Sequence, residues 1–422
     1  MHRAFRALKY RNFRLFFFGQ FISLIGTWMQ NVAMAWLVYR LTGSSELLGI
    51  VAFCGQIPVF LFSLLGGYWA DRHSRYRTVL GTQTSAMLLA FVLSALTLPH
   101  LIQVWQIITL AILLGLVNAF DIPARQSLFA EMVSREDLIN AIALNSSIFN
   151  GARIIGPAVA GVLVALIGEG WCFFGNAVSY LAVIAGLSMM KLEPRARRPD
   201  SGTALENIKE GVRFVFSNPP VRDLLLLVGL ISIAAIPYAV LMPIFADRIL
   251  GVGARGLGML MGGAGVGALA GALTLAARRE VRGLGRMAAG AAALLGVALI
   301  AFSFSRVYWL SIVLLVPVGF ATMLQMGCTN TLVQSMTPDH LRGRVMSFYA
   351  TMFMGMAPIG SLLAGLLAAH VGAPITVAIG GGVALLGSAL FAVRLPRLRV
   401  QGRQLIEAQR IVGSAPPEVG AG

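Results

Sequence analysis

The sequence predicts an all-α membrane protein that crosses the bilayer twelve times. Three observations support this fold class. Hydrophobic residues make up 57% of the 422 residues and charged residues only 12%, whereas charged residues form about 25% of a soluble domain. Apolar stretches of about 18 or more residues recur along the chain, which is the length that a helix needs to cross the hydrocarbon core. Finally, the two halves of the chain resemble each other.

The apolar stretches define twelve spans, separated mostly by short connections that carry Gly, Pro or charged residues. The first stretch follows a basic segment, but it continues to about Leu41 without a small-residue cleavage site, so we interpret it as a retained helix. The predicted spans are 13–39, 46–70, 77–98, 103–129, 138–167, 171–191, 222–247, 256–277, 286–304, 307–335, 342–369 and 373–393.

The longest connection divides the chain near its middle. Within it, Leu205, Ile208, Val212 and Val215 recur at helical spacing, which predicts a short helix on the membrane surface. The expected organisation is a six-helix half over 1–191, a central loop over 192–221, a second six-helix half over 222–394 and a tail over 395–422.

Lysine and arginine gather in alternate connections, including the segment before span one, the central loop and the tail. The opposite loops hold only Arg40, Arg248, Arg255 and Arg306. Because positively charged loops remain in the cytoplasm, both termini are expected there. Topology and contact with anionic lipids then explain the formal net charge of +16. Aromatic residues are not interleaved with the basic ones, so a nucleic-acid partner is not expected.

Short segments of the first half recur in the second at an offset of roughly 203–209 residues. The matching pairs are SREDL (134–138) with TPDHL (337–341), GPAVAG (156–161) with GSLLAG (360–365) and, more loosely, YRLTGSSELLG (39–49) with DRILGVGARGLG (247–258). Spans that are six apart run in the same direction, so the two halves form a parallel repeat.

The loop between spans two and three reads GGYWADRHSRYR and resembles the loop signature of the major facilitator superfamily. Gly67, Asp71, Arg72 and Arg75 carry the match, while Ser74 stands where that signature usually has glycine. Four further segments resemble the drug-exporting branch that includes macrolide efflux proteins and the enterobactin exporter. These segments are 26–45, 118–129, 138–161 and 341–349, and the similarity extends to about residue 395.

The resemblance implies a secondary transporter that works by alternating access, and in this branch a proton-driven exporter in a prokaryotic inner membrane. Its expected substrate is a mid-sized, largely apolar compound such as a drug or a siderophore. The expected partners are the lipid bilayer, a small-molecule substrate and protons, and the chain is expected to be monomeric. A metabolite importer or a lysolipid flippase of the same fold is the alternative.

A non-transporting receptor or a membrane-embedded enzyme is less favoured, because the chain shows neither a sensory domain nor a catalytic constellation. No glycine-rich phosphate loop with lysine is present, so ATP is not the expected energy source. Cys54, Cys172 and Cys328 lack metal-ligand spacing. We therefore expect no cofactor and no metal.

Asp71, with Gly67, Arg72 and Arg75, is expected to form a cytoplasmic gate. The resemblance implies that this aspartate is held near the start of span eleven, and a carboxylate is favoured at a helix N-terminus. Alternatively, these charges only fix the topology. Gly66 and Gly67 are expected to allow close packing at the end of span two.

Charged residues lie well inside two predicted spans: Asp121 and Arg125 in span four and Arg153 in span five. Intramembrane charges are costly and are usually paired or functional. We predict that Asp121 pairs with Arg125 or Arg153, which makes it a candidate for exchanging the coupled proton. The alternative is a permanent ion pair that locks spans four and five together.

Gly151, Gly156, Pro157 and Gly161 of span five resemble the glycine- and proline-rich signature of antiporters, although ordinary small-residue packing would also explain them. Polar or amphipathic side chains within the spans are candidates for lining a substrate cavity or, alternatively, for interhelical hydrogen bonds. These are Gln20, Trp28, Gln30, Asn31, Gln56, Asn118, Asn145, Asn150, Tyr238, Gln325 and Asn330.

Overall fold

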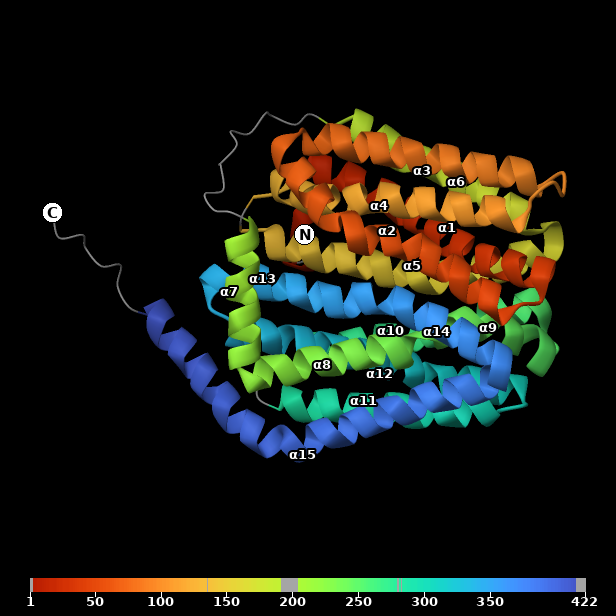
Figure 1. The fold of residues 1–422 in the computed structure, drawn as a ribbon. Helices are drawn as coiled ribbons and strands as arrows, with labels where there is room; N and C mark the ends of the chain where they lie inside the picture. The colour runs from red at the N-terminus through yellow and green to blue at the C-terminus, as the bar shows by residue number, and fades with distance from the viewer. Residues whose placement is uncertain (1–2, 135, 191–203, 279–280, 282, 415–422) are drawn as a thin grey trace.

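The computed structural model describes the chain except for residues 1–2, 135, 191–203, 279–280, 282 and 415–422. Its described residues form helices and connections without strands, and twelve helical segments are long and apolar enough to cross a membrane (Figure 1). The predicted fold class is therefore confirmed.

The first six spans pack together as an N-terminal group. Its elements are η1 (Arg3–Lys9), α1 (Arg11–Thr42), α2 (Ser45–Arg72), α3 (Arg75–Thr97), α4 (Val104–Met132), α5 (Leu138–Ile167) and α6 (Glu169–Ser188). Within this group α1 packs against α5 and α6, α2 against α4, and α3 against α4 and α6.

The last six spans form a C-terminal group, drawn green to blue in Figure 1. Its elements are α8 (Pro219–Ala234), η2 (Ile236–Leu241), α9 (Met242–Ile244), η3 (Phe245–Ile249), α10 (Gly253–Ala276), α11 (Leu284–Phe304), α12 (Tyr308–Met336), α13 (Asp339–Ala350), η4 (Thr351–Gly355), α14 (Met356–Val371) and α15 (Ala373–Ser414). Here α12 packs against α10 and α11, and α15 against α11 and α8.

Span seven is not the continuous helix that hydropathy suggests. The α-helix ends at Ala234 and gives way to a 3-10 turn, η2, before two short helical pieces complete the crossing. Pro237 lies in the turn and Pro243 in α9. A proline lacks the N–H that would continue the helical hydrogen bonds, so the break has a local cause in the sequence.

Span twelve continues well beyond its predicted end at 393. The helix α15 runs to Ser414 and carries Pro396 in its interior. Figure 1 shows that α15 bends and leaves the bundle. A proline inside a helix accounts for such a bend.

The central connection contains the predicted helix. α7 (Ala204–Ser217) lies across one end of the bundle and packs against α13 (Figure 1). Arg344 of α13 forms an ion pair with Glu210 of α7. The part of the loop before α7, as far as residue 203, lies outside the described residues.

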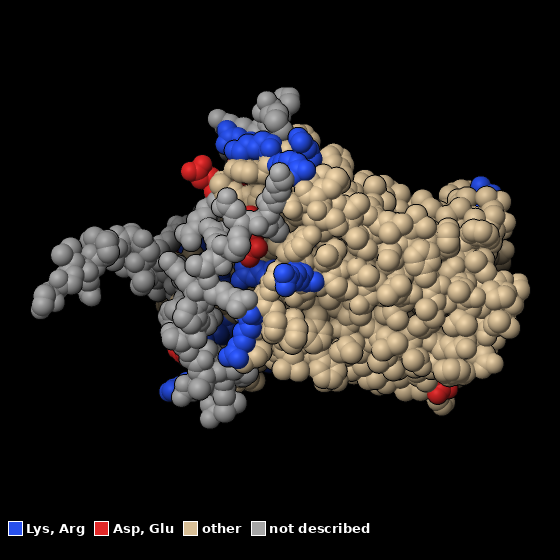
Figure 2. Space-filling view, turned by 90° about the horizontal axis from the view of Figure 1, so that it is seen from above, with Lys and Arg blue, Asp and Glu red and all other residues tan. Residues whose placement is uncertain are grey.

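Lysine and arginine side chains gather at the end of the bundle where α1 begins and α7 lies (Figure 2). We call this the terminal end and the opposite one the far end. At the terminal end η1 is tied to the start of α5, because Lys9 Nζ lies 2.6 Å from Asp137 Oδ2 and the Tyr10 hydroxyl donates to the same oxygen at 3.0 Å. The hydrogen bond from Lys9 lowers the pKa of Asp137.

The two groups meet where α5 packs against α10 and where α2 packs against α14. At the first crossing a Cβ atom on Gly258 would lie 2.5 Å from the Pro157 carbonyl oxygen and 2.7 Å from Gly161 Cα. At the second, a Cβ atom on Gly49 would lie 2.9 Å from Gly365 Cα. Both crossings therefore require glycine. They are also equivalent, because the internal repeat aligns Gly161 with Gly365 and Gly49 with Gly258.

Candidate functional site

Hydrogen bonds join the two groups at the far end. The Tyr39 hydroxyl of α1 donates to Asp247 Oδ2 at 2.8 Å, and Arg248 Nη2 donates to the Gly43 carbonyl oxygen at 3.0 Å. Gly43 ends α1 with a left-handed φ of 60°, a conformation that favours glycine. We call Tyr39, Gly43, Asp247 and Arg248 the far-end clasp.

The far-end clasp was not among the sites expected from the sequence. Its signal was present, however, because the loose repeat match pairs Tyr39 with Asp247 and Arg40 with Arg248. Arg40 itself stays within the N-terminal group, where its guanidinium forms two hydrogen bonds, of 2.7 and 3.3 Å, with the buried carboxylate of Glu169.

Removing the Tyr39 hydroxyl is expected to open the far end. Tyr39→Phe deletes one hydrogen bond to a charged acceptor, worth about 1.5–3 kcal/mol, and so favours far-end-open molecules about tenfold or more. Spin labels at the exposed Leu101 and Val307, one in each group, would report longer distances by double electron–electron resonance. The control is Tyr308→Phe; a shift of equal size in that variant would contradict a specific role for the clasp.

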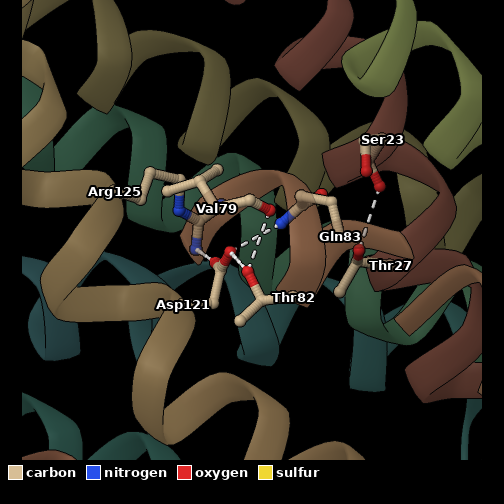
Figure 3. Close-up of polar contacts among 7 residues, drawn as sticks. All are labelled: Ser23, Thr27, Val79, Thr82, Gln83, Asp121 and Arg125. Carbon is tan, nitrogen blue, oxygen red and sulfur yellow. Dashed lines mark hydrogen bonds and ion pairs between the residues drawn. The ribbon is translucent and has the colours of Figure 1, made fainter. Parts of the chain in front are cut away.

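Asp121 lies in a polar site between α3 and α4 (Figure 3). Its side chain is only 2% exposed. Oδ1 accepts hydrogen bonds from Thr82 Oγ1 at 2.7 Å and Gln83 Nε2 at 2.9 Å, and Oδ2 lies 3.1 Å from Arg125 Nη2. We call Asp121, Thr82, Gln83 and Arg125 the Asp121 site.

The helices explain this geometry. α4 continues through Pro123, so residues four apart stand one turn apart on the same face, and Asp121 meets Arg125. Of the two predicted partners the structure therefore shows Arg125. Thr82 and Gln83 were not predicted as partners, because their approach depends on the packing of α3 against α4.

Arg153 lies apart from the Asp121 site. Its guanidinium carbon is 5.8 Å from the centre of the Trp28 ring, so the cation faces an aromatic side chain of α1. It is also close enough to Tyr238 of span seven to interact with it electrostatically. Arg153, Trp28 and Tyr238 are each partly exposed.

The antiporter-like motif of α5 occupies two helix crossings. A Cβ atom on Gly156 would lie 2.5 Å from Trp28 Cβ of α1, and Pro157 and Gly161 face Gly258 of α10, as described above. Gly151 is less constrained, with its nearest neighbour, a Phe21 ring carbon, at 3.5 Å. Three of the four motif residues thus stand where helices approach closely.

The predicted gate loop lies at the terminal end. Arg72 ends α2 with its guanidinium 4.2 Å from the Tyr68 ring centre, and Arg75 Nη1 donates to Glu131 Oε1 at 2.9 Å. The Asp71 side chain lies outside the described residues, so its role as a latch stays a prediction.

One expectation about this loop needs correction. A Cβ atom on Gly66 would lie 2.1 Å from the Ala119 carbonyl oxygen of α4, whereas one on Gly67 would meet nothing within 4 Å. Close packing at the end of span two therefore requires Gly66 and not Gly67.

Four of the cavity candidates are buried within the protein: Gln20, Gln30, Asn150 and Gln325. Gln30 Oε1 accepts a hydrogen bond of 2.7 Å from Asn176 Nδ2 of α6, which is the interhelical alternative, and Asn150 Nδ2 donates to the Ser146 carbonyl oxygen of its own helix. Both amide atoms of Gln325 lack a hydrogen-bond partner among the residues that the structure describes.

The other cavity candidates are more accessible. Those that are partly exposed are Trp28, Asn118, Asn145, Tyr238 and Asn330, and those that are exposed are Asn31 and Gln56. Among the described residues no group of three or more His, Cys, Asp or Glu side chains could hold a metal ion.

A solved structure with the same fold is the D-xylose–proton symporter, which superposes with a TM-score of 0.71 at 14% identity over 89% of this chain and 97% of that one. Two relatives in sequence are exporters. The multidrug efflux pump Tap of Mycolicibacterium fortuitum is 30% identical over 91% of this chain and 96% of its own length. The enterobactin exporter EntS of Escherichia coli O1:K1 / APEC is 27% identical over 91% of this chain and 90% of its own length.

The family model described as transmembrane secretion effector matches residues 2–414, nearly the whole chain. Its members and the fold relatives are transporters and not enzymes. Twelve apolar helices and bacterial exporter relatives identify an integral inner-membrane protein. The chain belongs to the transmembrane secretion effector family of the major facilitator superfamily.

Proposed function

We propose that this transporter exports a mid-sized organic compound in exchange for protons, by alternating access, with its terminal end in the cytoplasm. The observation that carries the proposal is the Asp121 site, where a buried acid has partners suited to both of its charge states. The exporter names of two relatives favour the outward direction of transport.

The Thr82 hydroxyl makes both charge states of Asp121 compatible with the same geometry. Thr82 Oγ1 lies 2.7 Å from Asp121 Oδ1 and 3.0 Å from the Val79 carbonyl oxygen (Figure 3). Since a hydroxyl has one proton and two lone pairs, it can donate to the ionised carboxylate. When Asp121 is protonated, the acid can donate to Thr82, which then donates to Val79.

The remaining partners of Asp121 are one charged donor, Arg125, and one neutral donor, Gln83. Arg125 supplies a positive charge, and its side chain is 22% exposed, so solvent can stabilise that charge when Asp121 takes up a proton. Gln83 donates through an uncharged amide. Asp121 is thus held by one partly exposed cation and by neutral donors, and we take this as the arrangement in which it exchanges a proton.

The distribution of charge supports the proposed orientation. Lysine and arginine gather at the terminal end (Figure 2), and loops of this composition stay in the cytoplasm. The far-end clasp would then hold the outer side closed, and the loop with Asp71, Arg72 and Arg75 would act as the inner gate. We take the monomer as the working unit.

The proposal is tested first in cells stripped of their own efflux pumps. Cells that express this chain should retain less of at least one compound from a broad panel. For that compound, the purified protein in proteoliposomes should move protons opposite to substrate, as reported by a pH dye inside the vesicles. Protons that move with the substrate would indicate an importer, and substrate flux that ignores the pH gradient would indicate a flippase.

A further inference from the structure

Arg153 is a cation for which the described part of the chain shows no acidic partner. Among the described residues no carboxylate lies within ion-pair distance of its guanidinium, because Asp121 pairs with Arg125 instead. Arg153 stands halfway along the 30-residue helix α5, far from either membrane surface. A charge at this depth is costly, so a side chain kept there unpaired calls for a function.

One aromatic ring faces this cation, and a second aromatic side chain interacts with it electrostatically. The Trp28 ring lies 5.8 Å from the guanidinium and is held at 5.7 Å and 73° by the Phe149 ring. Such an edge-to-face pair fixes the orientation of Trp28. Tyr238 belongs to the other group of helices and interacts electrostatically with Arg153. We call Arg153, Trp28 and Tyr238 the Arg153 site.

The Arg153 site lies where the two groups meet. Arg153 lies within the part of α5 that packs on α1, between Gly151 and Gly156, and a Cβ atom on Gly265 of α10 would lie 3.2 Å from the Arg153 carbonyl oxygen. Trp28 stands near the middle of α1, and Tyr238 belongs to the 3-10 turn that breaks span seven. Substrate sites of secondary transporters typically lie near the midplane, between repeats and beside broken helices.

We propose that the Arg153 site binds an acidic group on an aromatic ring of the transported compound. This rests on the proposed function and refines its substrate class, from a largely apolar compound to an amphipathic organic anion. A guanidinium presents paired N–H donors that match a carboxylate, and it also stacks on aromatic faces. Trp28 offers a flat apolar surface for a ring, and the Tyr238 hydroxyl can donate to an anion.

The test compares two probes of nearly equal shape, 2-naphthoate and its neutral amide 2-naphthamide, in equilibrium binding to the purified full-length chain. The wild type is expected to bind naphthoate about tenfold or more tightly than naphthamide. Arg153→Gln should abolish this preference while leaving naphthamide binding intact. Arg153→Lys should keep part of it, because lysine retains the charge and loses the fork and the stacking.

Arg14→Gln is the matched control, since Arg14 borders a groove between α1 and α6 at the terminal end; it should leave the preference unchanged. If Arg153→Gln does not fold, Trp28→Leu provides a second test. This variant removes the flat surface on which the naphthalene ring would lie, so it should weaken binding of both naphthoate and naphthamide. A preference for naphthoate that survives Arg153→Gln would overturn the proposal.

An anionic lipid headgroup could supply the same chemistry, so phosphatidylglycerol is titrated in a second arm. Naphthoate binding that depends on Arg153 in the absence of this lipid supports a substrate site. Arg153-dependent binding of the lipid alone would assign the charge to a headgroup and overturn the proposal. Because no proton gradient is used, a failure of anion binding leaves proton-coupled export standing, and a failure of export leaves the binding result valid.

Discussion

Replacing Asp121 with asparagine is expected to abolish proton-driven accumulation of substrate while transport down a gradient continues. The substitution keeps the shape of the side chain and an oxygen that can accept from Thr82 and Gln83. It removes the one group in the Asp121 site that can take up and release a proton. In proteoliposomes, accumulation driven by a pH gradient should fall to background, roughly a hundredfold, whereas exchange of labelled for unlabelled substrate should change little.

Asp223→Asn is the matched control. Asp223 is another buried acid inside a spanning helix, and it pairs with Arg222 at 3.1 Å and Arg394 at 3.4 Å in the C-terminal group. Asp223→Asn removes an ion pair within the C-terminal group but should leave proton-driven accumulation of substrate intact. If the Asp121→Asn protein still concentrates substrate with a pH gradient alone, Asp121 and Arg125 form a permanent lock and not a coupling site.

Replacing Gly258 with alanine is expected to separate the two groups at the far end. The added Cβ atom would lie 2.5 Å from the Pro157 carbonyl oxygen and 2.7 Å from Gly161 Cα. Both neighbours are backbone atoms that cannot rotate away, so the helices themselves must move. Overpacking of this kind costs about 1–3 kcal/mol, which would reduce the ratio of far-end-closed to far-end-open molecules about 5- to 160-fold. The distance between spin labels at Leu101 and Val307 would lengthen. The rate of transport would fall as the population of far-end-closed molecules falls.

Gly262→Ala provides the control on the same helix. A Cβ atom there meets nothing within 4 Å, and alanine is a better helix former than glycine by about 0.5–1 kcal/mol. This variant should therefore close normally and unfold at a slightly higher temperature. Normal closure of the Gly258→Ala protein would show that the α5–α10 crossing is not needed for the closed far end.

The fold was accessible from the sequence because lipid imposes a simple rule: a helix that crosses the bilayer must be long and apolar. This rule located all twelve spans. It could not reveal the break in span seven, because the average apolar character of 222–247 is unaffected by a 3-10 turn. Pro237 and Pro243 carried that information. The length of α15 beyond 393 was missed because its final part is polar and lies outside any apolar stretch.

The candidate sites were predictable to the extent that their partners are local. The spacing of four residues along one helix was enough to predict an ion pair between Asp121 and Arg125. Thr82 and Gln83 reach Asp121 from α3, 39 and 38 residues away, and only tertiary packing selects them. Tyr39 and Asp247 are 208 residues apart. For a contact between the two groups, such as Tyr39 with Asp247, the internal repeat is the usable signal in the sequence, because it relates equivalent positions in the two groups.

The glycine crossings have a mechanical consequence. Helices whose side chains interlock must lift over one another to change their angle, whereas Gly161 and Gly258, or Gly49 and Gly365, touch backbone to backbone with no side chain between them. These two backbone-to-backbone contacts can act as pivots for the relative motion of the two groups. The two groups can therefore change their relative angle at these crossings without separating interlocked side chains, while the hydrogen bonds of the far-end clasp favour the closed arrangement.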